Sequence, residues 1–330
     1  METQTFGRTD LEVSRLTFGC GAVGGLMTMG DHKDQDRAVA WARDNGINLF
    51  DTAASYGDGA SETNLGRALN RNTDGIVVST KVGLAESDLS DISAAVRRSI
   101  DASLTRLQLD HVDLFQLHNT IGRADRRGTI DASRVLAEVI PAFEEQRAAG
   151  KARYLGFTAK GDPQQLHRLV EAEAFDSAQV FYNLLVPSAG EPVPAGYPAE
   201  DYDRLLNAAG RHGVGAIGVR VLAGGALSGS ESRHPLGLPT VTPIGSNTTY
   251  STDVGRAKRF LPLIEEAFAT DLAELAIRYT ISNATLPTIE VGIASIDELQ
   301  SAAGAVNKGP LPPEALARIR TIQADLTATA

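Results

Sequence analysis

The stretch Asp51-Thr-Ala-Ala-Ser-Tyr56-Gly-Asp-Gly-Ala-Ser61-Glu62 follows an apolar run at residues 47–50 and precedes a helical pattern at 63–69. An apolar strand therefore ends on a carboxylate, and a tyrosine follows in a turn flanked by glycine. A strand that hands over to a loop at an ionisable residue is how an α/β barrel builds the wall of an active site. Taken alone, the stretch fits two interpretations equally well. Asp51 and Tyr56 either belong to an active site, or Asp51 caps a turn and Tyr56 is an ordinary loop aromatic. The rest of the chain decides between them.

Strand-like and helix-like patterns alternate along the whole chain. Eight strands are predicted at residues 16–18, 48–50, 76–80, 111–117, 153–157, 178–181, 214–219 and 287–291. Helices are predicted at 36–45, 61–69, 88–107, 134–149, 162–174, 200–211, 254–269, 271–282 and 295–306. Because the two alternate and the composition does not shift along the chain, we expect an α/β protein with one domain over residues 1–330, a (β/α)8 TIM barrel. A short hairpin near 5–13 precedes it, and a terminal helix at 314–326 follows.

Composition narrows the class of protein. The chain has 330 residues, of which 42% are hydrophobic and 22% charged, as in ordinary globular proteins. The net charge of −10 and the lack of a basic stripe argue against nucleic acid and anionic membranes as partners. The single cysteine, Cys20, excludes an intrachain disulfide and fits a reducing compartment. No signal peptide or apolar run of membrane-spanning length is seen, so we expect a cytoplasmic protein whose oligomeric state the sequence does not indicate.

Polar side chains stand at the carboxyl ends of several predicted strands, where a barrel brings them into one mouth. They are Asp51, Lys81, His118, Thr158 and Gln179, with Tyr56 one short loop beyond. A free tyrosine has a pKa near 10, and a lysine alongside favours the phenolate, so we expect Lys81 to lower the pKa of Tyr56. Asp51 would keep the lysine charged, and His118 could orient a carbonyl oxygen. The set predicts a tyrosine that exchanges a proton with a carbonyl or alcohol oxygen, while a cofactor transfers hydride.

Several motifs follow one another in a specific order. They are Phe18-Gly-Cys-Gly21, Asp51-Thr-Ala-Ala-Ser-Tyr56-Gly, Ser79-Thr-Lys81, Leu117-His118-Asn119, Gly156-Phe-Thr-Ala159 and Gln179-Val-Phe-Tyr-Asn183. Together they resemble the aldo-keto reductase superfamily over essentially the whole chain. The resemblance implies that Tyr56 is the general acid/base and that Asp51, Lys81 and His118 support it. It also implies an NAD(P)H bound in extended form across the mouth, with an aldehyde, a ketone or the corresponding alcohol as substrate, sugars and sugar-like alcohols included.

The resemblance carries over cofactor contacts residue by residue. Thr158 and Gln179 match positions that hold the nicotinamide carboxamide, although Ala159 stands where the family commonly has asparagine. Arg220 is expected either near the pyrophosphate or in a salt bridge across the mouth. Residues 223–229 resemble the glycine-rich segment that closes over the pyrophosphate. The expected cofactor-binding residues are Gly21, Thr158, Gln179, Arg220, Leu222, Gly224, Gly292, Ser295 and Glu298.

The adenosine end leaves two cofactors open. Residues Gly292-Ile-Ala-Ser295-Ile-Asp-Glu298 match the turn and helix start that cradle the 2′-phosphate in NADP-dependent members. Members usually carry a basic residue at Ala294 and often another near Glu298. Here Ser295 and Glu298 form the pattern of a capping box, whose carboxylate would repel a 2′-phosphate. The resemblance therefore favours NADP(H), and these residues favour NAD(H).

Three alternatives accompany this interpretation. Residues 19–24 read G-x-G-x-x-G after a strand, which is the dinucleotide fingerprint of a Rossmann fold. In that fold a helix starts at the third glycine, whereas 25–31 is predicted to be loop, so the barrel is preferred. The histidines show no metal-ligand spacing, and no metal is expected. Some relatives of such proteins act as partner subunits or cofactor sensors, and the complete Asp51, Tyr56, Lys81 and His118 set argues for catalysis instead.

The loops at the mouth are the least patterned parts of the sequence. Residues 24–31, 119–130, 183–198 and 223–251 are expected to form the substrate pocket. The last of these is too long for a simple connection, so it is interpreted as a lid or site loop that contains short structured pieces.

Overall fold

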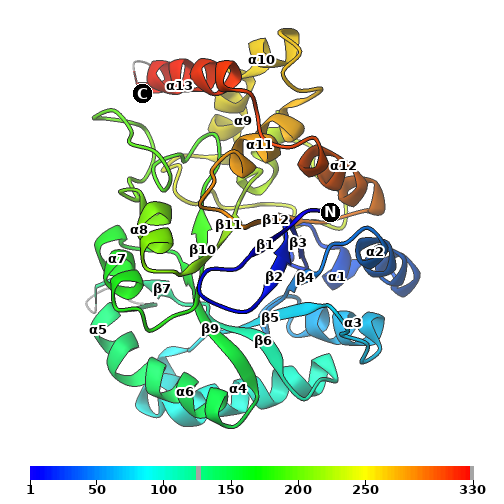
Figure 1. Ribbon diagram of the computed structural model, residues 1–330, viewed down its shortest axis with the longest axis vertical. Helices are drawn as coiled ribbons and strands as arrows, with labels where there is room; N and C mark the ends of the chain where they lie inside the picture. Colours follow the sequence, from blue (N-terminus) through cyan, green and yellow to red (C-terminus); the bar gives the residue numbers. More distant parts are fainter. Residues whose placement is uncertain (124–127, 328–330) are drawn as a thin grey trace.

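Eight parallel strands close into a barrel in the computed structural model, which describes residues 1–123 and 128–327. The order around the wall is β10, β11, β12, β3, β4, β5, β6 and β9 (Figure 1). Helices lie outside the barrel between successive strands, which confirms the predicted (β/α)8 TIM barrel. The barrel strands are β3 (Leu16–Gly19), β4 (Leu49–Asp51), β5 (Val77–Val82), β6 (Val112–Leu117), β9 (Ala152–Ala159), β10 (Ser177–Phe181), β11 (Gly215–Val219) and β12 (Thr288–Gly292).

The remaining elements surround this barrel. The helices are α1 (Leu26–Met29), α2 (His32–Asp44), α3 (Ala60–Leu69), α4 (Ile92–Leu107), α5 (Ala132–Arg134), α6 (Ile140–Ala148), α7 (Pro163–Glu171), α8 (Leu205–Arg211), α9 (Tyr250–Lys258), α10 (Leu261–Glu265), α11 (Leu272–Ile281), α12 (Ile296–Asn307) and α13 (Pro313–Thr327). Short turns of other types are η1 (Glu86–Ser90), η2 (Val135–Val139) and η3 (Ala223–Ser228). Strands β1 (Thr3–Thr5) and β2 (Glu12–Ser14) form an antiparallel hairpin, and β7 (Thr120–Ile121) pairs with β8 (Thr129–Ile130).

Several helix boundaries differ from the sequence prediction: α8 begins at Leu205 rather than at residue 200, and the predicted helix 254–269 is divided into α9 and α10. Three other differences have local reasons. Helix α2 begins four residues before the predicted start, because the Asp31 side chain accepts a hydrogen bond from the Asp34 N–H at 2.8 Å and caps the helix there. The predicted loop 25–31 contains the helical turn α1, which starts from Gly25 in the left-handed region. The predicted helix 134–149 has a wider π turn, η2, ahead of Pro141, which has no amide hydrogen to donate.

The inner and outer faces of the barrel wall have different chemistry. Alternate residues of each strand face opposite sides, so large apolar side chains pack outward against the helices. Phe18 and Phe50, for example, stack with ring centroids 5.4 Å apart. Facing inward, the buried hydroxyls of Thr17 and Thr288 are 2.7 Å apart. The inner face thus carries polar side chains, and that arrangement places the functional groups described below.

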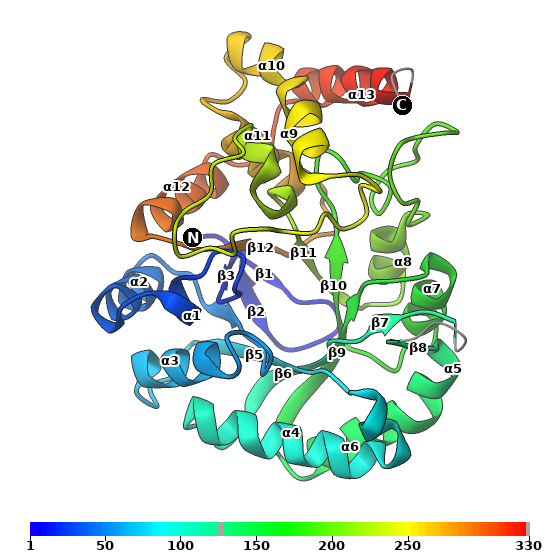
Figure 2. The same cartoon turned by 180° about the vertical axis from the view of Figure 1, so that it is seen from behind.

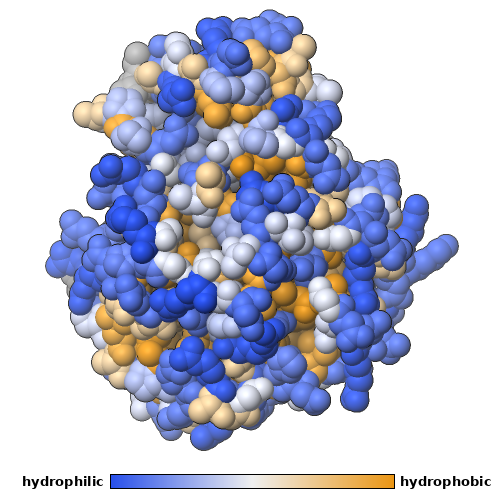
Figure 3. All heavy atoms as spheres, in the orientation of Figure 1, coloured by the Kyte–Doolittle hydropathy of each residue, from blue (hydrophilic) through white to orange (hydrophobic). Residues whose placement is uncertain are grey.

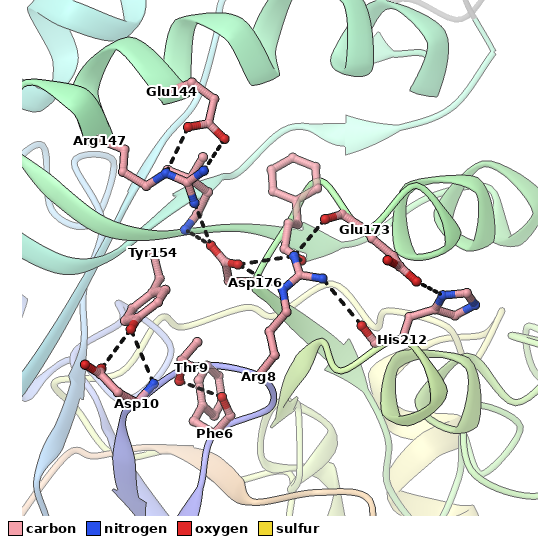
Figure 4. Close-up of polar contacts among 12 residues, drawn as sticks. Phe6, Arg8, Thr9, Asp10, Glu144, Arg147, Tyr154, Glu173, Asp176 and His212 are labelled. Atoms are coloured by element: carbon pink, nitrogen blue, oxygen red, sulfur yellow. Dashed lines mark hydrogen bonds and ion pairs between the residues drawn. The ribbon is translucent and has the colours of Figure 1, made fainter.

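The end of the barrel opposite the mouth is closed by the hairpin β1–β2 (Figures 1 and 4). Arg8, in the hairpin turn, donates hydrogen bonds to the Asp176 carboxylate at 3.2 Å and to the carbonyl oxygens of Glu173 at 2.7 Å and Phe175 at 2.8 Å. The buried Asp176 carboxylate also accepts from the Leu155 N–H at 3.0 Å. Hydrophilic side chains cover most of the same face of the molecule (Figure 3).

The mouth faces the viewer in Figure 2, where the chain between η3 and α9 passes over it. This crossing segment (residues 229–249) is tied to the loop after β3. Arg233 donates to the Val23 carbonyl oxygen at 3.2 Å, and the Leu238 N–H donates to that of Ala22 at 3.2 Å. The long stretch 223–251 is therefore a site loop with a short helical piece, as predicted. Within the described residues, no helix is long and apolar enough to cross a membrane.

We expect Asp176→Ala to lower the free energy of unfolding by about 2–3 kcal/mol, because it leaves Arg8 and a buried backbone N–H without their acceptor. Denaturant titration and the melting temperature would measure the loss. The matched control is Arg318→Ala, which removes an exposed pair with Glu266 and should move the melting temperature by only about 1 °C. Superimposable curves for the two variants would contradict an anchoring role for Asp176.

Candidate active site

A buried ion pair stands at the centre of the mouth. Lys81 on β5 and Asp51 at the end of β4 contact each other directly, and their side chains are fully buried. The Lys81 ammonium also donates to the Thr52 carbonyl oxygen at 2.8 Å and to the Tyr56 hydroxyl at 3.3 Å. The strand ends therefore bring together the carboxylate, the lysine and the tyrosine that the sequence singled out.

Two side chains that the sequence analysis missed hold this pair in place. The Ser79 hydroxyl donates to Asp51 Oδ1 at 2.7 Å. The Gln116 amide donates to Ser79 Oγ at 2.7 Å and to Asp51 Oδ1 at 3.3 Å. A signal was present, because Ser79 lies two residues before Lys81 and Gln116 two residues before His118. Residues two apart on a strand face the same side.

Tyr56 lies between Lys81 and His118. The Lys81 ammonium is 4.8 Å from the centroid of the Tyr56 ring, and the His118 ring meets it edge-on with centroids 5.7 Å apart. A side chain at Gly21 would contact this ring, since a Cβ built there would lie 3.5 Å from Tyr56 Cε2. The glycine therefore leaves room beside the ring, on the loop that follows β3.

A second set of contacts fixes the loop that carries Tyr56. The Ser61 hydroxyl, in the first turn of α3, lies 2.7 Å from the Thr52 hydroxyl and donates to the Cys20 carbonyl oxygen at 2.9 Å. Next to it, the buried Glu62 pairs with Arg106 on α4 at 2.6 Å. The start of α3 is thus joined to the ends of β3 and β4 and to the neighbouring helix, so the turn between them is held at both ends.

The protonation states follow from burial and the ion pair. Burial raises the pKa of Tyr56 to about 12; Lys81 lowers it, and the carboxylates of Asp51 and Glu290 raise it further. Lys81 thus lowers the pKa of Tyr56, as predicted, but burial has the larger effect and leaves the pKa above its usual value. Burial and the charges of Lys81 and Lys160 lower the pKa of His118 to about 3. At neutral pH the site presents a protonated tyrosine and a neutral histidine.

A further carboxylate, Glu290, projects into the mouth from β12 and was not singled out in the sequence. Its Oε2 accepts a hydrogen bond from Gln179 Nε2 at 3.2 Å. Burial and the neighbouring Asp51 raise the pKa of Glu290 to about 8. The strand predicted at 287–291 contains it, and alternation with Thr288 places Glu290 on the inner face of that strand.

The expected cofactor-binding residues lie along one arc of the mouth. Thr158 on β9 and Gln179 on β10 are in contact, with Thr158 Oγ1 donating to Gln179 Oε1 at 3.3 Å. Arg220 and Leu222 follow β11, and Gly224 lies in η3 with φ of 69°. At Gly224 a Cβ would approach Val241 to 2.6 Å, so packing alone requires glycine there. The arc continues at Gly292, the last residue of β12.

The start of α12 differs in one detail from the capping box that the sequence predicts. Ser295 caps the helix, and its hydroxyl accepts from the Glu298 N–H at 3.2 Å. The Glu298 carboxylate, however, accepts from the N–H of Ala294 at 2.9 Å rather than from that of the cap residue. The carboxylate still occupies the anion-binding end of the helix, so the expected repulsion of a 2′-phosphate is the same as for a capping box.

A cavity of about 1500 Å³ opens beside the mouth. Its walls include Thr120, Lys160, His167, Tyr202, Arg220 and Thr242. Of the loops expected to form the substrate pocket, those at 119–130 and 223–251 contribute, although residues 124–127 lie outside the described residues. The cavity is bordered instead by residues 160–171 and 200–203, in the loop after β9, the start of α7 and the segment before α8. None of the four side chains Asp51, Tyr56, Lys81 and His118 lines it, so the loops at 24–31 and 183–198 stay a prediction for the pocket above them.

Comparison with known proteins decides the family. A family model described as the aldo/keto reductase family matches residues 15–324. The chain belongs to this family. It is 27% identical over 320 residues to L-galactose dehydrogenase of Arabidopsis thaliana, covering 93% of this chain and 89% of that protein. A probable voltage-gated potassium channel subunit beta of Arabidopsis thaliana is 27% identical over 324 residues, covering 94% and 93%. The aldo-keto reductase AKR11C1 from Bacillus halodurans, in its holo form, superimposes with a TM-score of 0.71 at 28% identity, covering 99% of this chain and 96% of that chain.

Aldo-keto reductases are oxidoreductases that use nicotinamide cofactors and act on small carbonyl compounds, and the mouth of this barrel suits such a cofactor. Strands β9, β10, β11 and β12 are neighbours in the wall, so their expected contact residues form one continuous arc. Hydrogen-bonding groups lie at one end of it and a helix N-terminus lies at the other, which matches an extended dinucleotide. Among the described residues there is no group of three or more side chains arranged to hold a metal ion.

We expect the His118 ring to stay neutral from pH 5 to pH 9, because its pKa is lowered to about 3 by burial and by the positive charges of Lys81 and Lys160. The ring resonances, followed by NMR, should therefore not titrate in this range, and their absence from the His118→Gln spectrum would assign them. A midpoint near the ordinary histidine value of about 6.5 would contradict the predicted environment.

Proposed function

We propose that this protein is an NAD(P)-dependent oxidoreductase that interconverts an aldehyde or ketone and the corresponding alcohol, with Tyr56 as the general acid/base. The observation that supports it is the arrangement in which Lys81 is held by Asp51 and donates to the Tyr56 hydroxyl at 3.3 Å. The roles of Asp51, Lys81 and His118 as supports, and the single domain over residues 1–330, belong to the same proposal. A bound nicotinamide would supply or accept the hydride.

The residues would then act on the substrate oxygen. Neutral His118 can hydrogen-bond a carbonyl oxygen placed beside Tyr56, because their rings meet edge-on. In reduction, the protonated Tyr56 gives its proton to that oxygen, and the charged Lys81 stabilises the phenolate that remains. In oxidation the same proton moves back from the alcohol. Asp51 keeps Lys81 charged, since its carboxylate is among the groups that raise the lysine pKa against the effect of burial.

A sugar or sugar-like alcohol is the substrate class that the comparisons favour within this proposal. The dehydrogenase from Arabidopsis thaliana is named for a sugar, L-galactose, and it is similar to this chain over nearly its whole length. The cavity beside the mouth carries polar and charged side chains such as Lys160, His167 and Tyr202, which suit a hydroxylated compound.

The alternative is a partner subunit that binds the cofactor without substantial turnover, as the relatives named potassium channel beta subunits suggest. The two functions differ in a direct assay. Steady-state turnover with NAD(H) and NADP(H) against a panel of aldehydes, ketones, sugars and alcohols, in both directions, supports the enzyme if it occurs. Tight cofactor binding without turnover on any member of the panel supports the partner subunit.

Replacing Tyr56 by phenylalanine removes the proton donor and little volume. We expect turnover to fall by about 10²–10⁴-fold, while the dissociation constant of the cofactor changes little. Steady-state rates and a cofactor fluorescence titration on the same preparation would measure both. Turnover close to the unmodified rate would exclude Tyr56 as the acid/base.

For the choice of cofactor, we expect Glu298→Arg to strengthen NADP(H) binding more than NAD(H) binding, because it replaces a carboxylate at the start of α12 by a phosphate-binding group. The matched control is Asp297→Arg, which makes the same charge change at the neighbouring exposed residue. Fluorescence titrations with both dinucleotides measure the ratio. An equal effect on both, or the same ratio in the control, would remove Glu298 from the selection of cofactor.

A further inference from the structure

Glu290 is a carboxylate on the inner face of β12 that the proton transfer above does not use. The inward side of this strand is fixed by Thr288, whose hydroxyl meets that of Thr17 inside the barrel. Two residues later, Glu290 lies over the backbone of Gly19, where a Cβ would approach its Oε1 to 3.0 Å and its Cγ to 3.1 Å. Burying a carboxylate at the mouth costs free energy, so its partners are informative.

The hydrogen bond to Glu290 orients the amide of Gln179. Gln179 donates through Nε2 to Glu290 at 3.2 Å, and its Oε1 accepts from Thr158 at 3.3 Å. Because Oε1 accepts from Thr158, the amide nitrogen is the atom that points to Glu290. Thr158 and Gln179 are the residues expected to hold the nicotinamide carboxamide. Glu290 therefore lies one side chain away from the place of the nicotinamide.

We propose that the Glu290 carboxylate makes this site select the oxidised nicotinamide over the reduced one. The inference rests on the proposed function, since it needs a nicotinamide in the mouth. The oxidised ring carries a positive charge and the reduced ring does not, so a nearby carboxylate attracts only the oxidised form. In a partly buried site that attraction is much stronger than in water. In a pool of both forms, the oxidised cofactor would therefore occupy the site preferentially.

The proton on Glu290 links this selection to pH. Because the pKa of Glu290 is raised to about 8, the free protein carries the protonated form at lower pH. Binding of the cationic ring favours the carboxylate, so a proton leaves to solvent, and oxidised cofactor binds more tightly as the pH rises. The reduced ring gives no such effect.

Other charged and titratable groups face Glu290 from neighbouring elements. They are Cys20 after β3, Asp51 on β4, Tyr56 in the following loop, Lys81 on β5 and Arg220 after β11. The pKa of the Cys20 thiol is raised well above its usual value, chiefly by burial, that of Tyr56 is about 12, and that of Lys81 is raised. Arg220 stays charged as guanidinium groups do in proteins, and Asp51 is paired with Lys81. Glu290 is thus the group through which binding responds to pH between 6.5 and 8.5.

The test is calorimetric titration of the whole protein with NAD⁺ and with NADH at pH 6.5 and 8.5, in two buffers of different ionisation enthalpy to count released protons. The NADP⁺ and NADPH pair is measured in parallel. For the unmodified protein we expect the oxidised form to bind about tenfold more tightly at pH 8.5 than at pH 6.5, with proton release at the lower pH. The reduced form should change by less than about threefold.

Glu290→Gln should abolish both the pH dependence of oxidised-cofactor binding and the release of a proton. It should also shift the ratio of the two dissociation constants about tenfold in favour of the reduced cofactor. Glu290→Asp, which keeps the charge, should retain most of both effects. The matched control, Glu191→Gln, removes a partly buried carboxylate that accepts from Tyr182 and Tyr279 away from the mouth, and should behave as the unmodified protein.

Four results would overturn the inference. The first is that Glu290→Gln leaves unchanged both the ratio of the two cofactor dissociation constants and the pH response of binding. The second is that this variant loses equal affinity for the oxidised and the reduced cofactor, which would mean that Glu290 only positions Gln179. A third is the absence of proton release in the unmodified protein, a measurement that needs no variant to fold. If neither dinucleotide binds the unmodified protein, the proposed function itself fails, and this result is distinct from the other three.

Discussion

The pairing of Lys81 with Asp51 is the interaction on which the mouth of the barrel depends. Two opposite charges have been taken fully out of water, and such a pair persists only when its remaining donors and acceptors are satisfied. Here Ser79 on β5, Gln116 on β6 and the carbonyl oxygen of Thr52, just after β4, supply those partners. The positive charge so fixed lowers the pKa of the neighbouring histidine and lies within reach of the tyrosine hydroxyl. The ion pair and burial together therefore set the position and protonation of the whole group.

Around this pair the barrel wall divides into two functional halves. Strands β4, β5 and β6 carry the side chains that would handle the proton, and β9 to β12 carry those expected to meet the cofactor. The halves meet at β3 and β12, where Gly19 and Glu290 are in contact. A charge placed at that junction lies beside the proton-transfer group and, in the proposed function, beside the cofactor ring. This position explains why Asp51 contributes to the raised pKa of Glu290 although the two lie on different strands.

The sequence predicted the fold, and it predicted which residues the barrel brings together at its mouth, because strand ends are easily located. Asp51, Lys81 and His118 could be placed at one mouth from their positions alone. For Tyr56, pairwise reasoning predicts the effect of the lysine but not the larger effect of burial, which is a property of the folded chain. Glu290 lies within a strand rather than at its end, so the rule that selects strand-end residues does not select it. The acceptor role of Glu298 toward Ala294 depends on the geometry of a turn, which spacing does not show.

The hairpin that closes the far end of the barrel links the start of the chain to its second half. Gly7, with φ of 59°, lies so close to Gly215 that a Cβ would approach its nitrogen to 2.4 Å, and the Arg8 N–H donates to the carbonyl oxygen of Gly213 at 2.8 Å. These partners are synthesised about two hundred residues after the hairpin. The hairpin therefore cannot reach its final position until β10 and β11 have been synthesised and have formed, so closure of this end of the barrel is a late step in folding.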